Sequence, residues 1–357
     1  MLSRFTPIGW VDARVMMSGK PDLSEFDTLT EVQELRRANA TLQAQLRRAK
    51  AKTEDLVDAT IAAAHDAMVA FGPVPEVPAP KHDGRKRSPE VALWHLSDWQ
   101  GAKITTSYNS EVMRERVLRY CDKAHRLTEI QRGDHPVRDC VVAFGGDVIE
   151  GLFNFPQQVF EIDATIHGQF IASARLVADV VRRALAEYEQ VEVFTEWGNH
   201  GRIGSKRSAV PRADNLDRMV YTLAREIVDG HDRLIWHDCP EDIQKIAIGN
   251  YHAMLVHGDE TGRNGYVAPG TFANWVIKQQ SGALGWPFTD VYVGHYHQHK
   301  EDPLPNGLGS IYYTGSVESD NRYARDSLAS TAVPSQRLNF VDPEEGRVTV
   351  PLRVWLD

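Results

Sequence analysis

Five short segments of this 357-residue chain place carboxylate, amide or imidazole side chains directly after apolar, strand-like runs. Oxygen and imidazole donors without thiolates suit divalent ions such as manganese, magnesium, iron or zinc. Glycines beside these side chains allow the close backbone approach that crowded ligands require. The segments therefore predict a divalent-metal site. Its candidate residues are Asp98 and Gln100 in LSDWQ, Asp147 in FGGDVIEG, Asn199 and His200 in WGNHG, His257 in VHGD, and His295 and His297 in GHYHQ.

The elements that would position these side chains alternate between strand and helix from residue 91 onward. Strands are predicted at 91–96, 140–144, 191–195, 233–236, 243–248, 252–256, 291–293, 311–314 and 347–355. Helices are predicted at 111–131, 162–188, 214–228 and 271–281. The early alternation indicates βαβ units, and the clustered later strands indicate a second, more antiparallel sheet. Because ligand sites in α/β sheets gather at the carboxyl ends of strands, the five segments can converge there.

The N-terminal quarter of the chain has a different character. Residues 1–28 show no periodicity and remain unassigned. Residues 29–71 repeat apolar positions every three and four residues, which predicts a coiled-coil helix and a homo-oligomer, most simply a dimer. The alternative is a long helix packed on its own domain. Residues 72–90 are rich in proline and then basic, which predicts a solvated linker or, alternatively, a phosphate-binding arm, before a single domain at 91–357.

The overall composition limits the classes of protein that fit. Asp and Glu outnumber Lys and Arg by 49 to 40, which argues against a uniformly basic surface that binds duplex DNA by charge alone. No apolar run approaches the roughly 18 residues that span a bilayer, and residues 1–20 lack a signal-peptide core, so we expect no membrane partner. The three scattered cysteines form neither a disulfide framework nor a cysteine zinc site, and we expect a reducing, cytoplasmic setting.

In their order along the chain, the five segments resemble the signature of the calcineurin-like metallophosphoesterase superfamily: Asp-x-His, Gly-Asp, Gly-Asn-His-Asp/Glu, a lone His and Gly-His-x-His. The resemblance covers about residues 91–355 and implies a four-layer α/β/β/α sandwich with two metals at one edge of the sheets. It implies that Asp98, Gln100, Asp147 and His297 hold one metal, that Asp147 bridges to a second metal held also by Asn199, His257 and His295, and that His200 lies beside both without binding either.

The sequence departs from that signature at two positions. Gln100 stands where the family usually has histidine, and its neutral amide oxygen would favour manganese or magnesium over zinc, either directly or through a water. Gly201 stands where the family has an acidic residue that orients its neighbours. Another side chain would then take over this role, or the pocket would be more open.

The resemblance implies hydrolysis of a phosphoester without a covalent enzyme intermediate. Two cations sharing Asp147 would clamp the attacking and departing oxygens, and a metal-bridging hydroxide would attack phosphorus. His200 would stabilise the transition state or protonate the leaving oxygen. We expect two manganese ions as the cofactor, with magnesium, iron or zinc as alternatives.

The loop after His200 is the best indication of the substrate. Arg202, Lys206 and Arg207 come before any acidic residue, so we expect them to bind substrate phosphate, the alternative being a solvated loop. Trp99 and Tyr296 are interpreted as stacking faces for bases or, equally, as packing. Four remaining residues are interpreted as surface or capping groups: Asp163, His167, His237 and Asp259.

Segment 97–100 and the single α/β body look most similar to SbcD-type DNA-repair nucleases and related phage-encoded phosphoesterases. This implies a DNA nuclease or phosphodiesterase that acts on nucleic acid or a nucleotide, and it leaves an ATPase partner open. One alternative is a phosphodiesterase for cyclic nucleotides or other small phosphodiesters, which the acidic composition favours. An alternative of another class is a coiled-coil interaction protein whose metal site is only structural.

Overall fold

The computed structural model describes residues 76–357 apart from 153, 155–157, 205–211, 240–242, 261–268, 305–306, 308 and 321–332, together with residues 37, 40, 41, 62 and 66. The chain divides into two units, Met1–Ala59 and Thr60–Asp357. Residues 37, 40, 41, 62 and 66 are helical. The rest of the predicted coiled coil at 29–71, and the unassigned residues 1–28, lie outside the described residues, so the predicted dimer stays a prediction.

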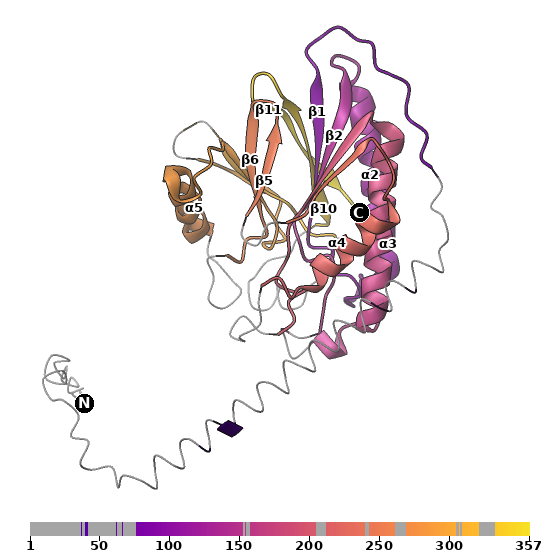
Figure 1. Ribbon diagram of the computed structural model, residues 1–357, viewed down its shortest axis with the longest axis vertical. Helices are drawn as coiled ribbons and strands as arrows, with labels where there is room; N and C mark the ends of the chain where they lie inside the picture. Colours follow the sequence, from indigo (N-terminus) through magenta and orange to yellow (C-terminus); the bar gives the residue numbers. More distant parts are fainter. Residues whose placement is uncertain are drawn as a thin grey trace, which may run out of the picture. The chain divides into compact units, whose positions relative to one another are not determined.

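The larger unit contains a six-stranded sheet among its described residues, in the order β11-β10-β1-β2-β3-β4. Its strands are β1 (Glu90–Leu96), β2 (Val137–Phe144), β3 (Gln190–Thr195), β4 (Leu234–His237), β10 (Ser335–Asp342) and β11 (Arg347–Trp355). The first four are parallel to one another, and β10 and β11 add to β1 in antiparallel fashion. The carboxyl ends of β1, β2 and β3 therefore lie at one edge, as Figure 1 shows.

Three helices cover the outer face of this sheet: α2 (Ser110–Gln131), α3 (Ile166–Glu187) and α4 (Leu216–Ile227). Each begins after a side chain that accepts a hydrogen bond from its first turn, namely Asn109, Thr165 and Asn215. Trp94 of β1 anchors two of the helices, because its ring meets Tyr120 edge-on at 5.6 Å and Tyr188, just after α3, at 5.9 Å.

A second sheet faces the first and has five strands in the order β5-β6-β7-β9-β8. They are β5 (Gln244–Ile248), β6 (Tyr251–Val256), β7 (Asp290–Val293), β8 (Lys300–Pro303) and β9 (Ser310–Tyr313). Buried residues of both sheets, such as Leu93 and Leu255, form one shared core. Helix α5 (Pro269–Lys278) packs Phe272 and Val276 on the other face and continues into a π-helical turn, η4 (Gln279–Ala283). The predicted four-layer α/β/β/α sandwich is confirmed.

The sequence prediction missed two strands. Strands β8 and β10 were not predicted, because each carries charged or polar residues through its length. The second sheet is mixed, as the prediction of a more antiparallel sheet allows: β5 and β8 pair antiparallel with their neighbours, and β6, β7 and β9 run parallel. This parallel part places the end of β6 beside the end of β7.

The described part of the proline-rich and basic segment before β1, residues 76–89, is largely exposed and makes a few contacts with the rest of the larger unit. Arg138 donates a hydrogen bond to the main-chain oxygen of Asp83 at 2.8 Å, and His82 is 2.8 Å from Glu189. Two of its basic side chains, Arg85 and Arg87, are in ion pairs with Asp83 and Asp134. No described helix is long and apolar enough to cross a membrane.

Candidate metal centre

The structure brings the predicted ligands together at the carboxyl ends of five strands. Asp98 follows β1, Asp147 follows β2, and Asn199 and His200 follow β3. His257 follows β6, and His295 and His297 follow β7. The close approach of these turns requires glycine at Gly198, where a Cβ atom would lie 1.9 Å from Oδ1 of Asp147.

His257 is the best-oriented of the candidate ligands. Its Nδ1 lies 2.8 Å from the main-chain oxygen of Gly145, which can only accept, so Nδ1 carries a hydrogen. The other nitrogen, Nε2, faces Oδ2 of Asp147 at 3.1 Å and Oδ1 of Asn199 at 3.1 Å. Burial disfavours the charged imidazole, but Asp147 outweighs it and raises the pKa of His257 well above its usual value. A proton on Nε2 thus serves both oxygens here, and a divalent cation bound among the three atoms would take the place of that proton.

His295 completes this group. Donor atoms of Asp147, His257 and His295 all lie within 4.8 Å of one another. The main-chain nitrogen of His295 donates to both carboxylate oxygens of Asp98, at 3.1 and 2.9 Å, which fixes the turn after β7. Burial and the neighbouring His257 lower the pKa of His295 to about 4, so its imidazole is neutral, as a metal ligand must be.

A second group forms on the other side of Asp147. His297 Nε2 is 3.3 Å from Oδ1 of Asp98, and Nε2 of Gln100 is 3.4 Å from both Oδ2 of Asp147 and Nε2 of His297. Oε1 of Gln100 is buried and has no hydrogen-bond partner among the described residues. Rotating this amide by 180° exchanges its oxygen and nitrogen and would direct the oxygen toward a cation held by Asp147 and His297. The donor set therefore fits a second divalent ion.

The backbone at these positions is strained. Five candidate ligands occupy the left-handed region, with φ of 55° at Asp98, 51° at Gln100, 53° at Asp147, 63° at His295 and 53° at His297. Among the other described non-glycine residues only Ala102 and Asp320 have positive φ. Such conformations are uncommon and gather at functional sites, because the surrounding structure must enforce them. The concentration in the candidate ligands is evidence for the site that does not depend on side-chain chemistry.

His200 lies beside these groups, held by Asp147 and Glu150. Its main-chain nitrogen donates to Oδ1 of Asp147 at 2.7 Å, and its Nδ1 is 3.2 Å from Oε2 of Glu150. Burial works against a charged ring, but Glu150 and Asp147 outweigh it and raise the pKa of His200 to about 9. His200 thus holds a proton beside the candidate metal ligands.

Glu150 is the acidic residue that contacts the ring of His200, and position 201 itself is tightly enclosed. A Cβ atom at position 201 would lie 2.3 Å from Oδ1 of Asn215, so the fold leaves no room for an acidic side chain there. Sequence reasoning did not assign a role to Glu150, nor to Glu318, whose Oε2 is 3.4 Å from Nδ1 of His297. The nearness of Glu150 to Asp147 in the chain was an available signal. Nothing in the sequence pointed to Glu318.

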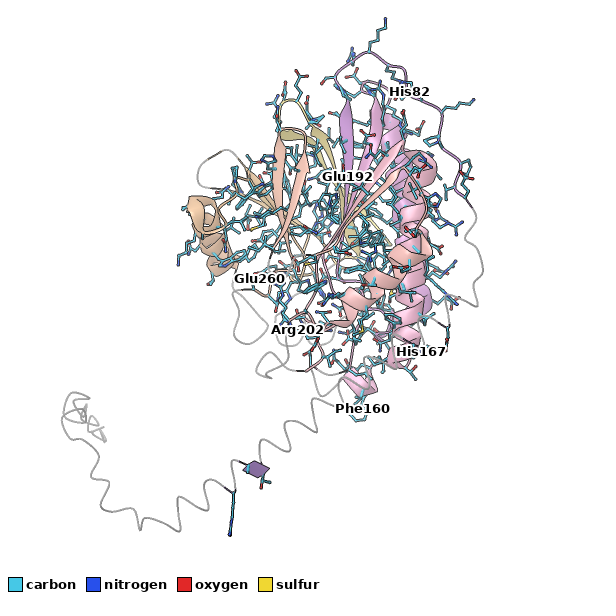
Figure 2. The ribbon with its side chains drawn as sticks, in the orientation of Figure 1. His82, Phe160, His167, Glu192, Arg202 and Glu260 are labelled. Carbon is cyan, nitrogen blue, oxygen red and sulfur yellow. The ribbon has the colours of Figure 1, made fainter. Side chains whose placement is uncertain are left out.

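The basic loop has a different outcome at each predicted position. Lys206 and Arg207 lie outside the described residues. Arg202 forms an ion pair with Asp259 at 2.6 Å, and it lies near Glu260 at the end of the sheets opposite His82, as Figure 2 shows. Asp259 is fully buried, so its interpretation as a surface group is wrong. Phosphate binding by this loop stays a prediction.

The two aromatic residues beside the ligands pack inside the protein. Trp99 is fully buried and meets Phe144 edge-on at 5.8 Å. Tyr296 contacts Phe272 of α5 and Tyr313 of β9, with ring centres 6.0 and 5.3 Å away. The packing interpretation therefore fits both residues, and base stacking does not fit Trp99.

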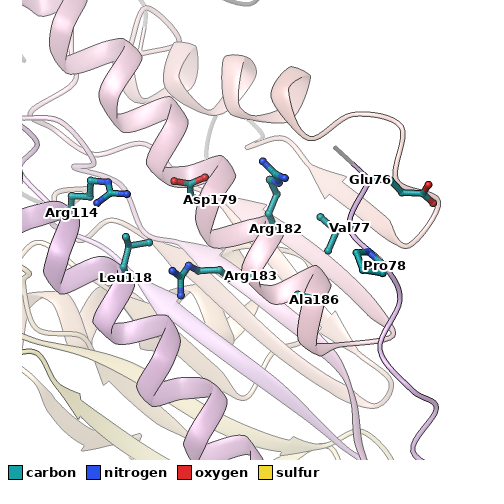
Figure 3. A pocket seen from close by; sticks show the side chains of 9 residues that line it. All are labelled: Glu76, Val77, Pro78, Arg114, Leu118, Asp179, Arg182, Arg183 and Ala186. Carbon is teal, nitrogen blue, oxygen red and sulfur yellow. The ribbon is translucent and has the colours of Figure 1, made fainter. Parts of the chain in front are cut away.

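A separate groove lies on the outer helical face. It has a volume of about 390 Å³ and lies between α2, α3 and residues 76–78 (Figure 3). Arg114, Arg182 and Asp179 are among its lining residues, and none of the candidate metal ligands is.

No family model and no curated protein matches the sequence. Solved structures with a similar arrangement include a zinc complex of Vps29 from Entamoeba histolytica, at 12% identity and a TM-score of 0.32, covering 74% of this chain and 99% of that one. A predicted phosphoesterase from Streptococcus pneumoniae shows 9% identity and a TM-score of 0.28, covering 74% and 98%. The sulfate thiohydrolase SoxB from Thermus thermophilus shows 10% identity and a TM-score of 0.30, covering 77% and 58%. At these values the likenesses establish neither family nor function.

Proposed function

We propose that this protein is a calcineurin-like metallophosphoesterase that hydrolyses phosphoesters with two divalent ions, most suitably manganese. The observation that carries the proposal is the central place of Asp147. Its Oδ2 faces His257 at 3.1 Å on one side and Gln100 at 3.4 Å on the other. One carboxylate thus belongs to two groups of donors, which is what a shared pair of ions requires.

Different residues of the chain would bind the ions and donate a proton in such a reaction. Asp98, Gln100 and His297 would hold one ion, Asn199, His257 and His295 the other, and Asp147 both. Bound divalent ions would polarise the phosphate ester and lower the pKa of the attacking water. His200 Nε2, 4.0 Å from Oδ2 of Asp147, holds a proton that it can give to the leaving oxygen. Glu150 fixes the orientation of that imidazole through Nδ1.

For the substrate we propose a phosphodiester of nucleic acid, cleaved by a DNA nuclease of the SbcD-like kind. The support is the basic loop after His200, in which Arg202 pairs with Asp259, two residues after the candidate ligand His257. The proposed dimer through residues 29–71 and an ATPase partner would belong to the same function, which we place in the cytoplasm.

A small phosphodiester such as a cyclic nucleotide is the second candidate, and one observation favours it. Arg202 is paired with Asp259, and Arg212 is 3.0 Å from Glu196 and 3.7 Å from Glu260. These arginines already have anionic partners, so the described part of the loop offers less charge to a long polyanion than the sequence suggests.

The experiment is a substrate panel with manganese, comparing single- and double-stranded DNA, cyclic nucleotides and bis-p-nitrophenyl phosphate. We expect DNA cleavage by the native protein and none by Asp147→Ala, with Asp163→Ala as the matched control, since the carboxylate of Asp163 accepts from Ser110 at the start of α2. Hydrolysis of small diesters alone would favour the second candidate. If no ester were hydrolysed with manganese, nickel or zinc, the metal site would be structural and the protein an interaction module.

A further inference from the structure

Lys103 is a lysine whose charged end lies inside the protein. The residue is 7% exposed, and its Nζ is 3.2 Å from Oε1 of Glu318 and 3.8 Å from Oε2 of Glu150. Each of these glutamates is only 2% exposed. A buried ammonium group is unfavourable unless anions compensate it, so the three charges depend on one another.

Each glutamate reaches one of the site's histidines. Oε2 of Glu150 is 3.2 Å from Nδ1 of His200, and Oε2 of Glu318 is 3.4 Å from Nδ1 of His297. The contacts form one continuous row: His200, Glu150, Lys103, Glu318 and His297. Its two ends are the proposed proton donor and a proposed metal ligand.

The backbone fixes this row from both sides. On one side, the main-chain nitrogens of Gln100 and Gly101 donate to the oxygens of Asp147 and Val148, at 3.0 and 3.2 Å. The main-chain nitrogen of Glu150 donates in turn to the oxygen of Gly101 at 2.9 Å. The segment that carries Lys103 therefore runs directly beside the segment that carries Glu150.

On the other side, the segment that carries Glu318 is hydrogen-bonded to Asp98, just after β1. The main-chain nitrogen of Val317 donates to the oxygen of Asp98 at 3.2 Å, and the hydroxyl of Ser316 donates to the same oxygen at 2.7 Å. The main-chain nitrogen of Glu318 donates to Oγ of Ser316 at 2.9 Å. Lys103 thus lies between two rigidly attached carboxylates.

The physical effect of the lysine follows from charge. Without a cation between them, two buried carboxylates would repel one another and each would lose hydration. The ammonium of Lys103 contacts both carboxylates, so its removal would let them turn away from the Nδ1 atoms of His200 and His297. A carboxylate accepting from Nδ1–H leaves Nε2 of each ring facing the site.

We propose that Lys103 is a positioning residue that holds His200 and His297 in their working orientations at once, because its ammonium group pairs with both Glu150 and Glu318. This inference rests on the proposed function for its catalytic consequence. The contacts themselves do not depend on that function, so the two can fail separately.

The primary test follows the imidazole ¹⁵N resonances of His200 and His297 in metal-free protein at one pH. Lys103→Met, which keeps the length of the side chain without its charge, is expected to shift the Nδ1 and Nε2 resonances of both rings. Glu150→Gln is expected to shift mainly those of His200, and Glu318→Gln mainly those of His297. Lys123→Met is the matched control, because Lys123 is a half-buried lysine of α2 that donates to the main-chain oxygen of Trp355 and to none of the five residues of the row. If the ¹⁵N resonances of both rings were unchanged in Lys103→Met, the proposal would be overturned.

The kinetic test uses the manganese-loaded protein on the substrate that the panel identifies. We expect Lys103→Met to lower kcat by about 10- to 100-fold with little change in KM, the size typical of groups that orient metal-site residues. If Lys103→Met does not fold, Lys103→Gln takes its place, and it must shift the ¹⁵N resonances of both His200 and His297. A protein without any hydrolysis would refute the proposed function, whereas the resonances would still decide the role of Lys103.

Discussion

The carboxylate of Asp217 holds the main chain of Asp147 in place. Oδ2 of Asp217, in the first turn of α4, accepts hydrogen bonds from the nitrogen of Asp147 at 2.8 Å and from that of Gly198 at 2.9 Å. Asp217 is fully buried, and burial together with the nearby Asp147 raises its pKa to about 7. One side chain that is not itself a candidate ligand thus ties together the turns after β2 and β3.

From this contact we predict that Asp217→Ala weakens metal binding although it removes no ligand. Two main-chain donors would lose their acceptor, and the turns that carry Asp147 and Asn199 would loosen. We expect an affinity loss of about 10- to 100-fold, measured by titration calorimetry with manganese. Asp217→Asn keeps an oxygen acceptor and is expected to bind nearly as the native protein does. Equal losses in both variants would contradict this explanation.

Replacing Gln100 by histidine is expected to change the metal preference. The imidazole would supply a nitrogen donor beside Asp147 and His297 in place of an amide oxygen, which favours zinc over manganese. We predict that the ratio of zinc to manganese affinity rises at least about tenfold, measured by competition with a coloured chelator. Gln131→His, at the end of α2, serves as control. An unchanged ratio in Gln100→His would mean that this side chain does not contact the metal directly.

Gly201→Ala tests the crowding beside the candidate proton donor. Its Cβ atom would lie 2.3 Å from Oδ1 of Asn215, and that oxygen caps α4 by accepting from Asp217. We predict a loss of about 1–3 kcal/mol in the free energy of unfolding, the usual cost of an overfilled site, measured by urea denaturation. Gly270→Ala is the control, since a Cβ atom there meets nothing within 4 Å and position 270 lies in helix α5. The control is expected to be neutral or more stable.

The stability of the fold should fall in mild acid because of His95. This residue is fully buried in β1, and burial, with the charge of Arg337 adding to it, lowers its pKa to about 3. Below the pKa of about 6.5 of an unfolded histidine, the unfolded chain binds a proton that the folded protein excludes. Stability contributed by this group is therefore present above pH 6.5 and decreases by about 1.4 kcal/mol per pH unit as the pH falls toward 3.

The measurement compares urea unfolding at pH 5 and pH 7.5. We expect His95→Gln to show a smaller difference between the two pH values than the native protein. His125→Gln, which changes an exposed histidine of α2, should leave the difference as it is. A native-like pH dependence in His95→Gln would show that other groups cause the acid sensitivity.

The sequence was sufficient to predict the elements that follow a simple apolar pattern. Strand β1 was predicted at 91–96 and spans Glu90–Leu96, and the predicted 347–355 agrees with β11. Strand β10 was missed because several of its buried side chains are polar, and their hydrogen-bond partners lie far away in the sequence. Gln336 donates to the main-chain oxygen of Gly315, and Arg337 donates to those of Lys300 and Tyr313. Such bonds leave no local periodicity to detect.

The candidate site shows the same division. Asp98, Asp147 and His257 could be found because each follows an apolar strand with glycine nearby, and strand ends meet in space. The groups that orient them could not be found in this way. Glu318 and Lys103 meet across more than two hundred residues of sequence, and only the packing of three segments reveals their contact.

The left-handed backbone of the five candidate ligands has a consequence for the evolution of this protein. A non-glycine residue in that region costs on the order of 1 kcal/mol, so together they forfeit several kcal/mol, against a usual net stability of about 5–15 kcal/mol. Glycine at Gln100, His295 or His297 would relieve this cost, whereas at Asp98 or Asp147 it would also remove a carboxylate that accepts from a main-chain nitrogen. Laboratory selection for heat resistance alone would therefore enrich glycine at Gln100, His295 and His297 and yield a more stable protein without the proposed metal site. The same positive φ angles thus lower the stability of the fold and position the candidate ligands.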